Sequence, residues 1–396
     1  MYFQTLDDKK ECVGVYSNGH LNFDEVPSGL TKTWKYTGSI DKDDIEYAWL
    51  LCGGKELSEV CPRDLSDQLL SSQKKFNAFM KAFRTANVDL RQNCIFDLVP
   101  YDFLKEFCEI KNRITEHVFE NYSQPTNYEF LKDAYKLIHK IRYQDLNVDV
   151  SGCRDLFLNS QDSRKVSSIL NGSRFIDYNL FGTATGRLST KRGSFPILTM
   201  KKKFRKLVKP KNDWFISLDY NSAEVRTLLA LSERPQPEID IHDWHCETVF
   251  KHVPELTRQK AKTMFFAWLY NPASKKANID FYDREKLLKD YYKDGIISTP
   301  LGRDIRVVKN KAFNYLIQST TADLVIDRAI QIDKALEGKQ SFISHIIHDE
   351  IVIDFSDKER YLLKDIKNLF ANNTLDEYVV NIKAGQNYYE LKDMNI

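Results

Sequence analysis

The chain has 396 residues, a formal net charge of +2 at pH 7 and 42% hydrophobic residues. This length is sufficient for about two or three domains with a substantial core. The near-neutral charge gives no general sign of a nucleic-acid partner, so any such contact has to be local. No apolar run is long enough to cross a bilayer, which argues against a membrane protein.

Cysteine usage bears on the cellular compartment. The seven cysteines are scattered and form no Cys-x-x-Cys pair. An odd number at irregular spacing predicts reduced thiols, rather than a disulfide framework or a structural zinc site. We therefore expect a cytoplasmic protein.

Residues 1–61 have the pattern of a small β-rich element. The runs 12–16 and 20–23 flank Ser17-Asn-Gly19, a sequence typical of a turn, which together predict a hairpin. The apolar run 47–52 predicts another strand. From about residue 65 to residue 168 the apolar positions recur at helical spacing, which predicts amphipathic helices packed on a core.

The segment 201–211 carries seven basic residues in eleven. Such a run is usually a solvated face, but it precedes an acidic strand end. Lys201, Lys202 and Lys203 are therefore candidates for phosphate contact.

Two acidic sites follow apolar runs. Asp219 ends the run 215–218 just before a helical pattern, and His348-Asp349-Glu350 forms a polar tip between two apolar runs, as in a β-hairpin. Acids set into apolar strands are costly unless cations neutralise them. Brought together, the two aspartates would hold a pair of Mg²⁺ ions about 3.5–4 Å apart.

The segment 258–270 predicts a helix with a special face. Its residues Arg258, Lys262, Phe266 and Tyr270 recur every four positions and so share one side of a helix. The two cations suit a triphosphate and the two aromatic rings suit a base or sugar. A basic stripe that runs into a core aromatic pair is the alternative interpretation.

With these motifs in order, the chain resembles the family A, polymerase-I-like DNA polymerases, and most of all their small phage members. The resemblance covers residues from about 176 to 396. It rests on Thr183-Ala-Thr-Gly-Arg187-Leu-Ser189, the Asp219 and Glu224 motif, the 258–270 helix, Gln318-Ser-Thr-Thr-Ala-Asp323 and His348-Asp349-Glu350.

The resemblance implies an α+β right-hand polymerase fold, with an antiparallel palm sheet and helical fingers and thumb. The implied domains are a β-rich N-terminal element at 1–61, a thumb at 62–175, a palm at 176–235 and 300–396, and fingers at 236–299.

It also implies a catalytic centre. Asp219, Asp349 and the backbone carbonyl of Tyr220 would bind two Mg²⁺ ions, with Mn²⁺ as a substitute, and Glu350 would be a supporting acid. Lys262 would be the general acid to the leaving pyrophosphate, because a lysine can give up a proton where an arginine cannot.

Further roles concern the nucleotide. Arg258 and Lys262 would bind the triphosphate, Phe266 would pack on the sugar and base, and Tyr270 would stack where the template base arrives. Glu224, with the side chain of Tyr220, would exclude a ribose 2′-hydroxyl. His245 is the candidate for a further phosphate contact and His242 is its rival.

Contacts to primer–template DNA are implied for Arg187, Asn314, Gln318 and His348. The chain departs from the family pattern at Ser222, where glutamine is usual, and at Ser319 and Thr321. None of these changes touches the two metal aspartates.

No 3′–5′ exonuclease is expected, because some sixty residues cannot house a nuclease domain of typical size. The expected partners are primer–template DNA and dNTPs, with helicase, primase, a separate exonuclease and a processivity factor as further candidates. A catalytically inactive DNA-binding replication accessory and a single-subunit RNA polymerase both stay open as alternative functions. Use of RNA templates also stays open.

Overall fold

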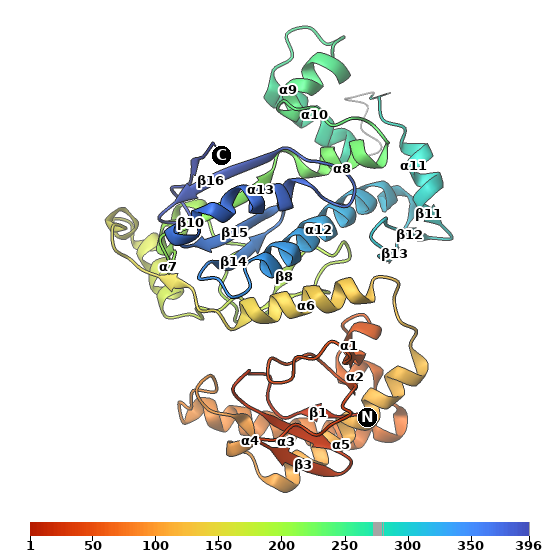
Figure 1. Ribbon diagram of the computed structural model, residues 1–396, viewed down its shortest axis with the longest axis vertical. Coiled ribbons are helices and arrows are strands. Elements are labelled where there is room, and N and C mark those ends of the chain that lie inside the picture. Colours follow the sequence, from red (N-terminus) through yellow and green to blue (C-terminus); the bar gives the residue numbers. More distant parts are fainter. Residues whose placement is uncertain (272–278, 280, 396) are drawn as a thin grey trace. The chain divides into compact units, whose positions relative to one another are not determined.

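The computed structural model describes residues 1–271, 279 and 281–395. It consists of two compact units, Met1–Tyr143 and Gln144–Ile396 (Figure 1). The first unit joins the expected β-rich element to the helices that follow it. Residues 144–175, which the sequence assigned to the thumb range, belong to the second unit.

The first unit begins with a three-stranded antiparallel sheet of β1 (Gln4–Thr5), β2 (Gly14–Ser17) and β3 (His20–Phe23). The predicted hairpin is confirmed, with Asn18 and Gly19 at positive φ in its turn. A second, parallel pair joins β4 (Lys32–Thr33) to β5 (Glu46–Tyr47).

The strand predicted at 47–52 is wrong. After Tyr47 the chain forms α1 (Ala48–Leu51), in which Ala48, Trp49 and Leu50 are all buried. A short, continuously apolar run suits a buried strand and a buried helix equally well, so its pattern could not distinguish them.

The predicted helical region of this unit is confirmed. Pro100, which has no N–H to leave unpaired, directly precedes α5, whose inner face buries Phe103, Ile114 and Val118. The helices are α2 (Leu57–Val60), η1 (Arg63–Leu65), α3 (Ser66–Thr85), α4 (Ile95–Leu98), α5 (Tyr101–Asn121) and α6 (Tyr128–Arg142).

The expectation that all thiols are reduced is also wrong. Cys12 and Cys94 form a disulfide, with their Cα atoms 5.6 Å apart, a distance typical of such bridges. The two residues are 82 positions apart in sequence, and only the folding of the unit brings them together. Spacing along the chain therefore gave no signal of the pair.

The second unit is built on a five-stranded antiparallel sheet, in the order β14-β15-β10-β16-β17. The central strand β10 is the apolar run that ends at Asp219, and α12 and α13 pack against the sheet (Figure 1). The predicted α+β class is confirmed. The elements are β10 (Trp214–Tyr220), α12 (Lys309–Ala335), β14 (Phe342–Ile347), β15 (Glu350–Phe355), η5 (Asp357–Leu362), α13 (Leu363–Ala371), β16 (Val380–Gly385) and β17 (Lys392–Asp393).

A largely helical subregion follows β10, around a core that includes Leu228, Phe265 and Phe313. It comprises α8 (Ala223–Leu231), α9 (Ile241–Trp244), the π-helical turn η4 (His245–Val249), α10 (Arg258–Tyr270), α11 (Arg284–Tyr291), β11 (Tyr292–Lys293), β12 (Ile296–Ser298) and β13 (Asp304–Arg306).

The chain before β10 contains short elements. They are β6 (Asn147–Val148), η2 (Arg154–Phe157), α7 (Ser160–Leu170), β7 (Tyr178–Asn179), β8 (Ser189–Thr190), η3 (Lys202–Leu207) and β9 (Val208–Lys209). In the described part of the chain, no helix is long and apolar enough to span a membrane.

Candidate active site

The two predicted aspartates meet at one edge of the sheet. Asp219 is the last residue but one of β10, and Asp349 lies in the two-residue turn between β14 and β15. Asp219 is paired with Glu350 across the β10–β15 ladder. Burial, together with the charges of Asp349 and Glu350, raises the pKa of Asp219 to about 7.

Both strand ends carry an unusual backbone conformation. His348 has φ +55°, and Ser222, three residues after Asp219, has φ +58°. Non-glycine residues seldom adopt this left-handed region, and such strain tends to occur at functional sites. The tight turn at His348 is what places Asp349 beside Asp219.

Two neighbouring strands support these acids. Asn381 of β16 is opposite Asp219 and hydrogen-bonds its carboxylate, and Lys383 lowers its pKa slightly against the larger raising effects. Glu350 accepts hydrogen bonds from Ser217 (2.6 Å) and Tyr388 (2.7 Å). These bonds hold Glu350 beside Asp219 but outside the pocket lining.

These donors fit Mg²⁺. Two carboxylates and the Tyr220 carbonyl are hard oxygen ligands, and Mg²⁺ is usually bound by one or two carboxylates while its remaining positions are filled by water and substrate phosphates. Within the described residues no set of three or more His, Cys, Asp or Glu side chains forms a metal cage. Burial and then the charges of Asp349 and Glu350 raise the pKa of Asp219, and a bound divalent cation would offset both effects.

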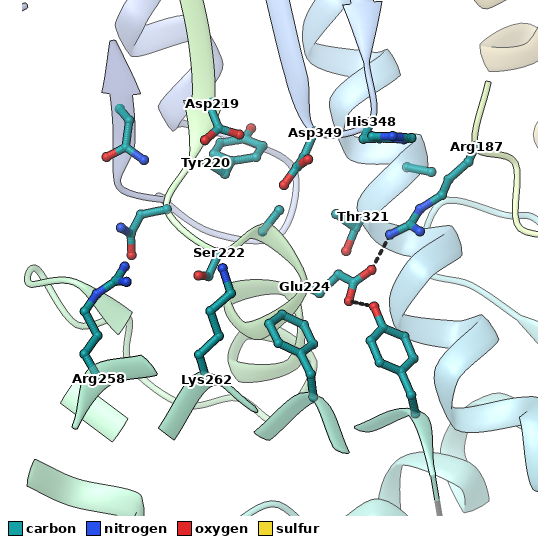
Figure 2. Close-up of a pocket in the computed structure, with 16 residues that line it drawn as sticks. Arg187, Asp219, Tyr220, Ser222, Glu224, Arg258, Lys262, Thr321, His348 and Asp349 are labelled. Carbon is teal, nitrogen blue, oxygen red and sulfur yellow. Dashed lines mark hydrogen bonds and ion pairs between the residues drawn. The ribbon is translucent and has the colours of Figure 1, made fainter. Parts of the chain in front are cut away.

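A pocket of about 360 Å³ opens between this sheet edge and α10. Figure 2 shows Asp219 pointing into it from the end of β10 and Asp349 from the β14–β15 turn, with Arg258 and Lys262 pointing into it from α10. The predicted four-residue stripe is confirmed as one helix face. The lining residues are Arg187, Asp219, Tyr220, Asn221, Ser222, Ala223, Glu224, Arg258, Lys262, Phe266, Tyr270, Thr321, Ala322, His348, Asp349 and Asn381.

The two aromatic residues of the stripe stack on each other, with ring centroids 5.7 Å apart and planes inclined by 11°. The Tyr270 hydroxyl donates to Glu224, which also pairs with Arg187 (Figure 2). Burial and the bond to Glu224 raise the pKa of Tyr270 to about 12. Glu224 thus links α8, the end of α10 and the segment before β8.

The side chain of Tyr220 lies elsewhere than the sequence led us to expect. Its ring stacks on Phe370 at 4.1 Å, and its hydroxyl donates to the Phe370 carbonyl. Tyr220 therefore anchors α13 to β10.

The histidine candidates are both buried. His245 hydrogen-bonds Tyr282 at 2.9 Å and is not among the pocket-lining residues. His242 contacts Ser222 at 3.0 Å, and its ring lies 6.0 Å from that of Phe266. Burial lowers the pKa of His242 to about 4 and that of His245 to about 3, so both are neutral at pH 7.

Much of the basic run is neutralised within the chain. Four of its lysines form ion pairs with four aspartates of an earlier segment: Lys203–Asp162, Lys206–Asp155, Lys209–Asp149 and Lys211–Asp145. Lys202 lies over the ring of Tyr389. The structure does not bring Lys201, Lys202 or Lys203 into the pocket lining.

The remaining DNA candidates lie on α12. Gln318 hydrogen-bonds the Tyr270 hydroxyl, so it is adjacent to the pocket without lining it. Asn314 lies one turn earlier and is half-buried. Its Oδ1 atom finds no hydrogen-bond donor within the described ranges.

Sequence reasoning missed Asn381, Asn221 and Asp240. Asn381 reaches the site only because β16 pairs with β10. Asn221 donates to Asp240 at 3.0 Å, and Asp240 in turn holds Arg258. The sequence gives no signal that Asp240 lies within hydrogen-bonding distance of Arg258, because only the fold brings the two residues together.

One aspartate at a strand end and one in a hairpin turn, at the edge of an antiparallel sheet and facing a helix that carries cations and aromatic rings, form the arrangement of a right-hand polymerase. The polymerase domain of Pol1 from M. smegmatis, solved with DNA primer-template and dNTP, has the same fold. Its TM-score is 0.67 at 14% identity, and the match covers 98% of this chain and 95% of that one.

Proteins of similar sequence are also DNA polymerases. The thermostable DNA polymerase I of Thermus aquaticus is 26% identical over 283 residues, which is 59% of this chain and 33% of that protein. DNA polymerase I of Synechocystis sp. is 22% identical over 289 residues, or 54% and 29% of the two chains. The chain spans about a third of the length of these relatives, and no protein-family model matches it. The resemblance to polymerase-I-like, family A enzymes that the motifs indicated is confirmed.

Proposed function

We propose that the protein is a DNA-directed DNA polymerase that extends a primer 3′-end with dNTPs. The observation that carries this proposal is the pocket itself, in which two carboxylates face two cations and two stacked rings. A nucleoside triphosphate has matching parts: a polyanionic tail, a flat base and a reacting phosphate between them.

The residues would divide the work as follows. Arg258 and Lys262 bind the triphosphate, and Lys262 gives a proton to the departing pyrophosphate. Phe266 packs on the sugar and base. Asp219, Asp349 and the Tyr220 carbonyl hold Mg²⁺, which when bound would activate the primer 3′-hydroxyl and stabilise the leaving group.

Glu224 would act as the sugar gate. It is buried and fixed from two sides by Arg187 and Tyr270, so a ribose 2′-hydroxyl would meet a carboxylate that cannot easily move. In this proposal a template base stacks where Tyr270 now lies, so Tyr270 leaves Glu224 on productive binding and Arg187 alone continues to hold the carboxylate. Such a step gives selectivity through induced fit.

The wider role is also a proposal. We infer a replicative enzyme of phage type that works in the cytoplasm without its own 3′–5′ proofreading. Helicase, primase, a processivity factor and a separate exonuclease are candidate partners. The domain assignments stay as proposed from the sequence, with one change: residues 144–175 pack with the palm-containing unit.

The test is extension of a primer on a single-stranded DNA template with Mg²⁺ and four dNTPs. We expect template-directed extension by the wild type and none by Asp219→Ala or Asp349→Ala. A folded wild-type protein that binds DNA but does not extend the primer would favour the inactive accessory instead.

The choice of sugar and the choice of template are tested in the same assay. A preference for ribonucleotides in the wild type would identify a single-subunit RNA polymerase, whereas a deoxyribonucleotide preference that is lost in Glu224→Ala supports the gate. Extension on an RNA template would establish reverse transcription.

A further inference from the structure

A buried ion pair lies behind the pocket. Arg303, in the turn between β12 and β13, donates to Asp323 of α12 through Nε (2.7 Å) and Nη2 (2.6 Å). The Asp323 side chain is fully buried and that of Arg303 is 11% exposed. Buried pairs of this kind often add little net stability, because desolvation offsets their attraction. What the pair does provide is a guanidinium held in one fixed orientation.

The face of the Arg303 guanidinium packs against the backbone of Gly186. A Cβ atom at Gly186 would lie 2.6 Å from the guanidinium carbon, closer than real contacts allow. Gly186 also has φ +73°, a conformation that side chains disfavour. Position 186 therefore favours glycine for two independent reasons, its positive φ and the closeness of Arg303.

The next residue is Arg187, whose guanidinium pairs with Glu224. The backbone here forms a turn closed by Gly186 N–H to the Thr183 carbonyl (3.3 Å) and by the Thr183 hydroxyl to the Arg187 carbonyl (2.8 Å). The ion pair therefore contacts the residue adjacent to the one that holds the sugar gate.

We propose that Arg303 and Asp323 are positioning residues for sugar selection. Asp323 binds one edge of the Arg303 guanidinium, and the flat face of that guanidinium fixes the position of the Gly186 backbone. Arg187, the next residue, then holds Glu224 at the sugar of the incoming nucleotide. This inference rests on the proposed polymerase function and adds residues that lie outside the pocket lining to its selectivity.

The experiment measures single-nucleotide incorporation with a dNTP and the matching rNTP, giving kcat and KM for each. Gly186→Ala keeps the ion pair but displaces the turn. Arg303→Lys keeps the positive charge but loses the planar guanidinium with its two parallel hydrogen-bond donors. The matched control is Gly193→Ala, since Gly193 has φ +85° but no atom within 4 Å of the position that a Cβ would take. Thermal unfolding establishes that each variant is folded.

We expect Gly186→Ala and Arg303→Lys to lower the dNTP/rNTP ratio of kcat/KM by about tenfold or more, as displacements of about 1 Å can do. Gly193→Ala should retain the wild-type ratio. If kcat/KM of a folded Arg303→Lys variant falls equally for dNTP and rNTP, the Arg303–Asp323 pair has only a structural role and the proposal is overturned. This outcome does not depend on whether Gly186→Ala folds. A wild type that incorporates neither nucleotide would instead refute the polymerase function, and this inference with it.

Discussion

Asp240 binds Arg258 in a bidentate manner, accepting hydrogen bonds from Nε at 2.9 Å and from Nη2 at 2.7 Å. The same carboxylate accepts the backbone N–H groups of His242 and Asp243 and so caps α9. These donors hold the pKa of Asp240 well below its usual range, despite partial burial. The arginine proposed to bind the triphosphate is thus oriented before any nucleotide arrives.

Asp240→Asn should raise the KM for dNTPs. Freeing the arginine adds up to about 2 kcal/mol of side-chain entropy that binding must remove, while the lost negative charge favours the triphosphate by about 1 kcal/mol in a water-like medium. The entropy effect is the larger, so KM should rise several-fold. Steady-state incorporation kinetics measure this change.

Asp243→Asn is the control for that experiment, because Asp243 lies 4.0 Å from Arg258 and more than half of its side chain is exposed. It should leave KM near the wild-type value. A fall in KM for Asp240→Asn would mean that the carboxylate competes with the nucleotide rather than orienting Arg258.

Asp219→Asn should stabilise the metal-free protein while abolishing extension. Burial and the charges of Asp349 and Glu350 raise the pKa of Asp219 to about 7, so its ionised form is unfavourable without a cation. A neutral amide removes that repulsion. Urea unfolding at pH 8 in EDTA should give a higher midpoint for the variant, and Mg²⁺ should stabilise the wild type more than the variant. A lower midpoint in EDTA would contradict this account of the site.

Three of the buried histidines, His242, His245 and His345, predict a fold that loses stability in acid. Burial lowers the pKa of His242 to about 4 and the pKa values of His245 and His345 to about 3, below the unfolded value of 6.5. Below pH 6.5 the unfolded chain therefore binds protons that the folded chain does not, and stability falls as the pH drops towards 4. Above pH 6.5 these groups contribute no slope.

The measurement is the free energy of unfolding from pH 7 to pH 4.5, without metal. His245→Gln should flatten part of the slope if it folds, and His20→Gln, at an exposed residue of β3, should not. Asp219 acts in the opposite direction over the same range, because its raised pKa favours the protonated folded state. The slope should therefore steepen in Asp219→Asn.

The disulfide sets a further expectation. Reduction of Cys12–Cys94 opens a loop closed by residues 82 positions apart. In the chain-entropy description this lowers the free energy of unfolding by about 4.5 kcal/mol. Cys12→Ser and treatment with a reductant should each lower the unfolding midpoint of the wild-type protein. Cys61→Ser, at a half-buried free thiol, is the control. Equal midpoints with and without reductant would show that the bridge does not form in solution.

Local patterns predicted the elements that form the candidate active site. The four-residue spacing of Arg258, Lys262, Phe266 and Tyr270 fixed one face of α10, and the apolar run before Asp219 fixed a strand end. Each of these patterns lies within one short segment of the chain, where the helical or strand period applies directly.

Contacts between distant segments could not be predicted in the same way. Asn381 meets Asp219 through strand order, and Cys12 meets Cys94 through packing of the first unit. The direction of the Tyr220 ring depends on Phe370 of α13. None of these relationships leaves a mark on local spacing, because each is decided by which elements pack together.

His348 provides a last test, because it joins stability to function. It occupies the first position of the two-residue turn between β14 and β15 with φ +55°, a conformation that glycine adopts without steric cost. His348→Gly relieves strain in the folded state but makes the unfolded chain more flexible. These effects oppose each other at about 1 kcal/mol each, so the unfolding midpoint should change little.

Activity should respond differently. His348 lines the pocket beside Asp349, and a glycine there both removes the ring and loosens the turn that places the carboxylate. We expect kcat for dNTP incorporation to fall about tenfold or more at nearly constant stability. Asn18→Gly, in the hairpin turn of β2 and β3 at φ +49°, is the matched control and should leave kcat unchanged. A His348→Gly enzyme with wild-type kcat would show that neither the ring nor the rigid turn contributes to placing Asp349.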